Sequence, residues 1–179
     1  MSTMKLVAVS GGLGHPSRAA ALAKAITEAI AARMPIDAHA ISVADLVQDL
    51  AGVISAKSAP ASVSEAVTRI ETADALVVTT PVYRGSYTGL FKHLFDLVHH
   101  EALIGKPVLL AATGGSDRHS LMIDHQLRPL FAFFQSLTLP LGVYANDSDF
   151  SNYEVSSDAL KERIQLAVES GIGYLELRG

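Results

Sequence analysis

Three segments of the sequence combine glycines with hydroxyl, aromatic or guanidinium side chains, and each follows an apolar run of strand length. They are residues 10–18, 80–87 and 113–116. In an open α/β sheet, ligands bind at the carboxyl ends of the strands, where the strand order reverses. If the three preceding strands are neighbours, the segments converge. Their residue types then indicate a site for a phosphorylated planar ligand.

Residues 10–18 have the composition of a phosphate-binding loop. Glycines at 11, 12 and 14 permit a tight turn and present backbone N–H groups, and the N-terminus of the following helix adds positive potential. Pro16 suits the first turn of that helix, where a missing N–H has no effect. A plain glycine-rich turn with an exposed arginine is the structural alternative. The residues expected to contact the phosphate are Ser10, Gly12, Gly14, Ser17 and Arg18.

The spacing Gly12-x-Gly14-x-x-Ser17 nearly matches the dinucleotide-binding fingerprint. Serine replaces the third glycine, however, and no acidic residue ends the expected second strand to bind a ribose hydroxyl. Asp37 and Asp45 lie at the start of that strand and beyond its end. A mononucleotide phosphate therefore fits this loop better than a dinucleotide does.

Residues 80–87 suit a flat heterocycle. Pro81 restricts the backbone, while Tyr83 and Arg84 offer a planar aromatic ring and a planar cation. The glycine pair of the third segment lets a ring edge approach the main chain closely. Tyr87 lies at helical spacing with the apolar residues that follow it, so we expect it in the core. Each segment alone is also compatible with a plain turn, and the prediction rests on all three together.

Apolar runs of strand length alternate with helical patterns along the whole chain, which predicts βαβ units and a parallel sheet. Residues 1–179 are expected to form a single α/β domain, doubly wound and flavodoxin-like, with helices on both faces of a five-stranded sheet of order 2-1-3-4-5. Strands 1, 3 and 4 are neighbours in that order. Residues 45–62 give few signals and are expected to be partly irregular. The expected strands are residues 5–10, 38–43, 75–80, 107–113 and 139–145, and the expected helices are about 17–34, 63–70, 88–99, 121–135 and 157–176.

Composition excludes several classes of function. The 179 residues are 49% hydrophobic and carry a formal net charge of −4 without a basic stripe, so we expect no nucleic acid partner. The chain has no cysteine, which excludes disulfides, thiolate metal sites and cysteine nucleophiles. We recognise neither a secretory signal nor a membrane span and expect a cytoplasmic protein.

The seven histidines show no metal-ligand spacing. His99 and His100 are adjacent and are expected to face apart on a helix, and His119 and His125 are six residues apart. The sequence also lacks the Gly-x-Ser-x-Gly elbow of many hydrolases. We therefore expect neither a metal site nor a hydrolytic triad.

Taken in chain order, residues 10–18, 80–89 and 112–116 resemble the NAD(P)H-dependent FMN reductases. Residues 115–130 are closer still to the methanesulfonate and alkanesulfonate utilisation branch of that family. The resemblance covers nearly the whole chain. It implies a flavodoxin-like fold, FMN, NADH or NADPH as the hydride donor, and assembly into a homodimer or homotetramer.

The resemblance also implies roles for individual residues. Ser17 and Arg18 would contact the FMN phosphate with help from the main chain of residues 10–14. FMN itself supplies the chemistry, a hydride passing from nicotinamide C4 to flavin N5, so no catalytic side chain is expected. Reduced FMN would pass to a separate flavin-dependent monooxygenase. The isoalloxazine would be lined by Pro81, Val82, Tyr83 and Arg84 on one side and by Thr113, Gly114, Gly115 and Ser116 on the other.

Three alternatives remain open at this point. A quinone or azo reductase would retain its FMN as a prosthetic group. A flavodoxin-type electron carrier would show no substrate turnover, although carriers usually present a strongly acidic face that this dispersed charge does not indicate. A nucleotide-binding regulatory domain would transfer no hydride.

The chain departs from its relatives at two places. Many relatives begin the phosphate loop with Gly-Ser-x-Arg, whereas residues 11–14 here are Gly-Gly-Leu-Gly, so Arg18 and backbone amides must bind more of the phosphate. This departure, together with the few bulky side chains beside the loops and the absence of tryptophan, predicts weak, exchangeable FMN binding. His125 replaces a tyrosine that alkanesulfonate-type relatives carry in a π-bulge at a subunit interface, and we interpret it as an ordinary interface or surface histidine. Residues 121–134 have apolar side chains on more than one face, which indicates an interface helix.

Overall fold

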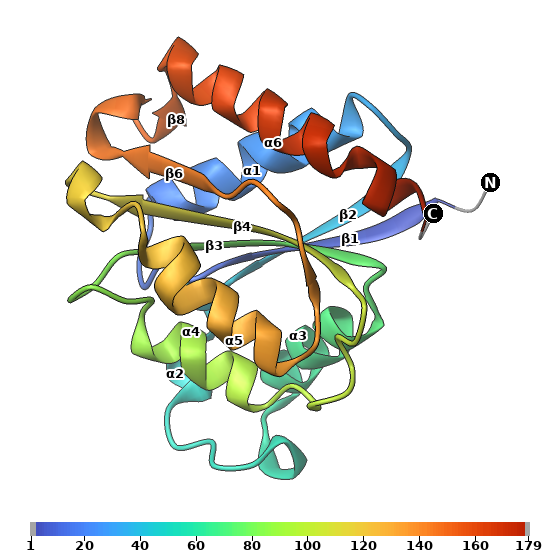
Figure 1. Ribbon diagram of the computed structural model, residues 1–179. Coiled ribbons are helices and arrows are strands. Elements are labelled where there is room, and N and C mark those ends of the chain that lie inside the picture. Colours follow the sequence, from blue (N-terminus) through green and yellow to red (C-terminus); the bar gives the residue numbers. More distant parts are fainter. Residues whose placement is uncertain (1–2, 178–179) are drawn as a thin grey trace.

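The computed structural model describes residues 3–177, and its centre is a twisted parallel sheet between two layers of helices (Figure 1). The sheet has the order β2-β1-β3-β4-β5. β6 pairs with the C-terminal part of β4, on the same side of β4 as β5. This confirms the predicted flavodoxin-like order of a doubly wound sheet. The strands are β1 (Met4–Ser10), β2 (Ile36–Ser42), β3 (Ala75–Pro81), β4 (Pro107–Gly114), β5 (Leu137–Thr138) and β6 (Val143–Asn146).

The fifth position of the sheet holds two short strands, so the expectation of one continuous strand over residues 139–145 is wrong. β5 and β6 pair in parallel with the two ends of β4. Pro140 lies between them, and proline has no N–H for the ladder. Leu139 still donates its backbone N–H to Val108 O at 2.9 Å, after which the pairing is interrupted.

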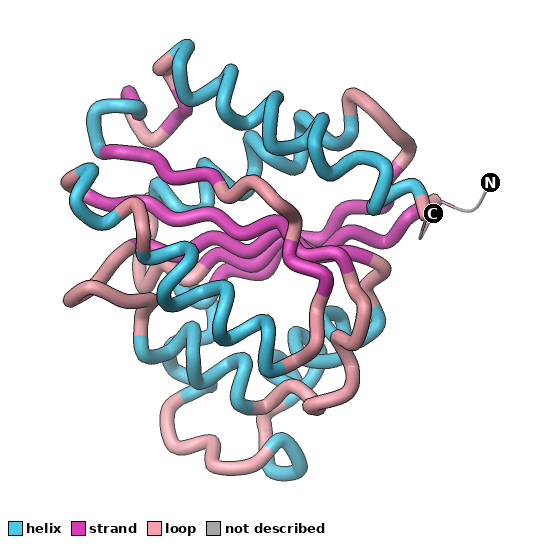
Figure 2. Tube along the Cα trace, viewed as in Figure 1, coloured by secondary structure: helices cyan, strands magenta, loops and turns pink. Residues whose placement is uncertain are grey.

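The helices cover both faces of the sheet, as predicted (Figure 2). α1 and α6 lie on one face, and α2, α3, α4 and α5 lie on the other (Figure 1). Within residues 3–177, no helix has the length and apolar character needed to cross a membrane. The helices are α1 (Arg18–Ala31), α2 (Val43–Leu50), α3 (Ala61–Thr72), α4 (Gly89–Asp96), α5 (Arg128–Phe133) and α6 (Asp158–Glu176).

Alternate residues of the strands enter two separate cores. Leu6 and Ala8 pack with α1 and α6, whereas Val7 and Val9 pack toward the opposite helices. In the second core the ring of Phe95 is tilted against Phe91 and edge-to-face with Phe131, with centroids 4.8 and 5.1 Å apart. A fully buried side chain of this size contributes about 1.5–3 kcal/mol. The carboxyl ends of the strands therefore rest on a closely packed scaffold.

Helix α2 corrects the prediction for the segment after β2. It begins at Val43, which we expected to end the strand, and it occupies residues 45–50 of the stretch expected to be partly irregular. Its buried residues Val43, Leu46 and Leu50 do recur at helical spacing, but the helix is only 8 residues long. Residues 51–60 contain a three-residue 3₁₀ turn, Ala56–Ser58, and otherwise match the expected irregularity.

Pro16 lies outside α1, so its predicted place in the first helical turn is wrong. Ser17 is the N-cap of the helix, and its side chain accepts a hydrogen bond from the backbone N–H of Ala20. Arg18 is the first helical residue, and the peptide bond between His15 and Pro16 is cis. The proline thus shapes the approach to the helix instead of starting it.

A short antiparallel hairpin that the sequence did not predict follows β6. It consists of β7 (Phe150–Ser151) and β8 (Glu154–Val155). Asn152 and Tyr153 connect the two strands with φ angles of 49° and 60°. This left-handed turn places the hairpin beside the N-terminal end of α1, next to the predicted phosphate loop.

Candidate functional site

The three predicted segments converge at one edge of the sheet. Ser10 lies opposite Thr79 in the β1–β3 pair, and Pro81 lies opposite Thr113 in the β3–β4 pair, so the segments leave the sheet side by side. Between them is a cleft of about 440 Å³ at the carboxyl ends of the strands. Its walls contain, among others, Gly12, Gly14, Ser17, Arg18, Pro81, Val82, Tyr83, Thr113, Gly114 and Gly115.

Three predicted site residues lie outside this lining. Ser10 is buried at the end of β1 and faces a hollow beneath α1. Arg84 lines a shallower hollow with Val82 and Tyr83. Ser116 accepts a hydrogen bond at Oγ from the backbone N–H of Arg118 and caps a 3₁₀ turn, Asp117–His119.

The first segment, residues 10–18, forms the first loop of the cleft, and backbone hydrogen bonds fix it to the sheet. Gly11 donates its N–H to Thr79 O at 2.8 Å, and Thr88 Oγ1 donates to Gly11 O at 2.8 Å. A Cβ at Gly12 would lie 2.4 Å from Ser17 Oγ, so a side chain there would displace the N-cap of α1. The backbone thus approaches the helix N-terminus closely, and the first turn of α1 contains no acidic residue. This arrangement suits an anion.

The second loop, residues 80–87, contains a tight two-residue turn. Tyr83 and Ser86 exchange backbone hydrogen bonds of 2.8 and 3.1 Å, with Arg84 and Gly85 at φ angles of 53° and 82°. These angles match a type I′ turn. The turn leaves Tyr83 52% exposed at the mouth of the cleft. Tyr87 packs against Phe91 at the edge of the core and is only partly buried, so its predicted place in the core is confirmed in part.

The third loop, residues 113–116, packs closely against Tyr144. Tyr144 OH donates to Ser116 O at 2.6 Å, and a Cβ at Gly114 would overlap the same hydroxyl. Burial of the phenol raises the pKa of Tyr144, because desolvation disfavours its charged form. The backbone of Val82 donates to Thr113 O at 2.8 Å and joins the second and third loops. The two loops therefore form one continuous wall.

The sequence analysis missed the part of the cleft that follows β6. Asp147 and Tyr153 line it together with Arg18. Arg18 Nη1 lies 3.4 Å from Asp147 Oδ1, and its guanidinium lies over the Tyr153 ring, 5.3 Å from the centroid. Asp147 directly follows β6, at the same sheet edge as the predicted loops. That position is a signal that could have identified it.

The family of the chain follows from comparison with known proteins. The family model for NADPH-dependent FMN reductases matches residues 4–151, which include all three loops. The chain belongs to this family. An NADH-dependent FMN reductase, SfnF, of Pseudomonas fluorescens is 52% identical over 166 residues, 93% of this chain and 89% of that protein.

Two further proteins extend this similarity. An NADPH-type FMN reductase of Pseudomonas aeruginosa is 52% identical over 168 residues, 94% of this chain and 90% of that protein. The apo structure of an NADH:FMN oxidoreductase (EMOB) superimposes with a TM-score of 0.85 at 31% identity, covering 99% of this chain and 91% of the other.

The helix expected over residues 121–135 begins with a π-helical turn, Ile123–Leu127, and continues as α5. His125 lies in this turn and is exposed. Gln126 accepts a hydrogen bond at Oε1 from Ser86 Oγ at 3.1 Å. The π-turn of this family member therefore contacts the second loop of the cleft.

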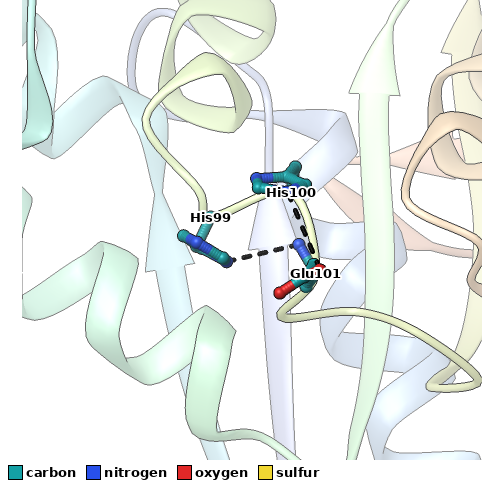
Figure 3. Close-up of side chains that lie close together, drawn as sticks. All are labelled: His99, His100 and Glu101. Atoms are coloured by element: carbon teal, nitrogen blue, oxygen red, sulfur yellow. Dashed lines mark hydrogen bonds and ion pairs between the residues drawn. The ribbon is translucent and has the colours of Figure 1, made fainter.

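One expectation about the histidines is wrong. α4 ends at Asp96, so His99 and His100 lie in the following turn, where their ring centroids are 4.5 Å apart (Figure 3). With Glu101 they form a group whose potential ligand atoms lie within 4.8 Å of one another. All three are exposed, and Glu101 donates its backbone N–H to His99 Nδ1 at 3.3 Å. The group precedes β4, at the sheet edge opposite the cleft, and takes no part in it.

Two glycines of the first loop give a matched test of its geometry. A Cβ at Gly11 would lie 2.8 Å from Phe91 Cδ2 and 2.9 Å from Thr80 Oγ1, whereas a Cβ at Gly14 meets no atom of the described chain within 4 Å. We expect Gly11→Ala to lower the free energy of unfolding by about 1–3 kcal/mol because the site is already filled. Gly14→Ala should change it by less than about 1 kcal/mol. Urea unfolding measures both, and equal effects would contradict this geometry.

Proposed function

We propose that the cleft binds FMN and that the protein reduces it with NADH or NADPH. The observation that carries the proposal is the meeting of a phosphate-type loop with two flat-walled loops in one cleft. The volume of about 440 Å³ is within the usual range of ligand pockets, about 300–1,000 Å³. The names of the relatives, FMN reductases with NADH or NADPH, support the same activity.

The residues present fit the phosphate of FMN. The N-terminus of the 14-residue helix α1 faces the cleft, capped by Ser17. Backbone amides there and the Arg18 guanidinium supply donors for an anion. In this proposal Ser17, Arg18 and the main chain at Gly12 and Gly14 bind the phosphate, and Ser10 supports the loop from beneath.

The second and third loops fit the flavin ring. Pro81, Val82 and Tyr83 would line one side, and Thr113 to Gly115 the other, with Arg84 and Ser116 at the periphery. The close contact of Gly114 with Tyr144 keeps the third loop thin enough for a ring edge to reach its backbone. When bound, FMN would accept a hydride at N5 from the nicotinamide. The side chains bind and orient the reactants, so none is assigned an acid–base role.

A second hollow competes with this assignment on size alone. A groove of about 690 Å³ lies between α1, the hairpin and α6, lined by residues such as Lys24, Glu28 and Gln165. It borders the sides of two helices instead of the strand ends, and its charges are mixed. The smaller cleft has the convergent loops and the helix N-terminus, and we therefore place FMN there.

The fate of the product is part of the proposal. The chain has no tryptophan to stack on the flavin ring, so reduced FMN would leave and supply a separate flavin-dependent monooxygenase. The resemblance to the sulfonate utilisation branch supports this use. A quinone or azo reductase that retains FMN, and an electron carrier, are not favoured, because the similar proteins named above are FMN reductases. We also propose a cytoplasmic location, consistent with a chain that has no cysteine.

We further propose that the protein forms a homodimer or homotetramer through the π-turn and α5. Leu121 lies just before the π-turn and Phe133 ends α5, and they are 61% and 68% exposed. Large exposed apolar side chains on one element are typical of an interaction surface.

Steady-state kinetics test the activity and the phosphate contact together. We expect NADH or NADPH oxidation to saturate with added FMN, and riboflavin, which lacks the phosphate, to need a higher concentration. Arg18→Ala should raise the KM for FMN about three- to tenfold with little effect on riboflavin, the scale of one partly exposed charged contact. Arg33→Ala, which removes the same charge just beyond the far end of α1, is the control. An unchanged KM for FMN in Arg18→Ala would count against this assignment.

Sedimentation velocity tests the assembly. Phe133→Ser should shift the protein toward smaller species, because it removes an apolar contact from the proposed interface. Leu166→Ser changes a similarly exposed side chain on α6 and should leave the distribution unchanged. A wild-type protein that is monomeric at micromolar concentration would disprove the interface.

A further inference from the structure

The arginine assigned to the FMN phosphate already has two partners. Its guanidinium lies 3.4 Å from the Asp147 carboxylate and over the ring of Tyr153. The Arg18 and Asp147 side chains are 39% and 53% exposed, so the pair lies at the rim of the cleft, where a ligand can reach it.

The position of Asp147 is determined by the turn that follows β6. Asn146 Oδ1 accepts a hydrogen bond from the Asp147 N–H at 3.0 Å. The Asn146 N–H donates to Asp149 Oδ2 at 2.7 Å, as part of a capping box between Asn146 and Asp149. Asn146 Nδ2 also donates to Asp117 Oδ1 at 2.8 Å. A Cβ at Gly115 would lie 3.7 Å from Asp147 Oδ2. The carboxylate is thus held between the first and third loops and faces the cleft.

The hairpin holds the aromatic partner in a similar way. Tyr153 adopts a φ of 60° in the connection between β7 and β8. The chain beyond β8 returns to Asp149 O, which accepts hydrogen bonds from the backbone of Ser156 and Ser157 at 2.9 and 3.2 Å. The hairpin backbone therefore places the Tyr153 ring, which is 43% exposed, against the Arg18 guanidinium.

A phosphate entering the loop meets this arrangement directly. The phosphate and the Asp147 carboxylate are both negatively charged, and both would bind the Arg18 guanidinium. The two anions therefore repel each other at the rim of the cleft. We propose that Asp147 competes with the phosphate of FMN for Arg18, so that it weakens FMN binding and promotes release of the reduced product. Tyr153 is a positioning residue that keeps the guanidinium within reach of both anions.

This inference rests on the proposed function, since it concerns the same phosphate loop. It attributes the exchange of FMN to the Arg18–Asp147 pair. An arginine held only by the loop would bind the phosphate more tightly. The carboxylate gives the arginine a partner to return to when the flavin leaves. The weak binding expected from the missing Gly-Ser-x-Arg start then has a second, separable cause.

Fluorescence titration of FMN and riboflavin into wild type and Asp147→Asn tests the inference. We expect the Kd for FMN to fall about three- to tenfold in Asp147→Asn, the effect of removing one partly exposed charge, while the Kd for riboflavin stays within about twofold. The dissociation rate of FMN should fall in parallel. Asp37→Asn removes an equal charge from exposed β2 and should change neither Kd. Asp147→Ser provides a second substitution, and thermal melting confirms that each variant folds.

Competition for Arg18 predicts a further result. In an Arg18→Ala background, the gain from Asp147→Asn should be clearly smaller than in wild type, because the shared partner is absent. Tyr153→Ala should raise the Kd for FMN, and Tyr153→Phe, which keeps the ring, should restore it. An equal gain with and without Arg18 would show simple repulsion and overturn the competition.

The outcomes separate this inference from the proposed function. If wild type binds FMN more tightly than riboflavin but Asp147→Asn leaves the Kd for FMN unchanged, the phosphate loop stands and the role of Asp147 is wrong. If wild type binds FMN and riboflavin equally, the phosphate loop itself is wrong, and the inference is overturned with it.

Discussion

The parallel register of β1, β3 and β4 is the constraint on which the rest of the site depends. Ser10 opposite Thr79 and Pro81 opposite Thr113 bring three loops to one edge, although the loops are far apart in the chain. A shift by one residue would turn each strand's side chains to the other face and disrupt both cores. The same packing that stabilises the sheet thus fixes the geometry of the cleft.

Close approach of backbones determines what this cleft can recognise. At Gly12 and Gly114 an added Cβ would meet Ser17 or Tyr144, so main-chain groups form the surfaces that side chains would otherwise occupy. Amides and a helix N-terminus suit a phosphate, and thin flat walls suit a ring. In the proposed function, such a site would position the reactants and leave the hydride chemistry to the flavin and the nicotinamide.

Much of this arrangement could be predicted because it is local or strongly patterned. β3 and β4 are buried on both faces and therefore appear as continuous apolar runs. The three loops are recognisable from glycine, proline and hydroxyl residues within a few positions of each strand end. The resemblance to the FMN reductases, drawn from those residues, is confirmed by the family match.

The errors share a different cause, since each depends on contacts or chain ends that local patterns do not determine. α2 has only 8 residues, so its sequence shows helical periodicity over a short stretch only. α4 ends before the two histidines that were expected in it. Pro140 divides the expected fifth strand because proline lacks the N–H that the ladder needs. Asp147 and Tyr153 enter the cleft only because β6 and the following hairpin return to the start of α1.

Amide-resolved NMR of ¹⁵N-labelled protein, titrated in parallel with FMN and riboflavin, tests most directly whether the three loops form one flavin cradle. Both ligands should shift the amides of Val82, Tyr83, Gly114 and Gly115, and FMN alone should shift those of Gly12, Ser17 and Arg18. Shifts confined to the groove between α1 and α6, or absent from any of the three loops with FMN, would contradict the account.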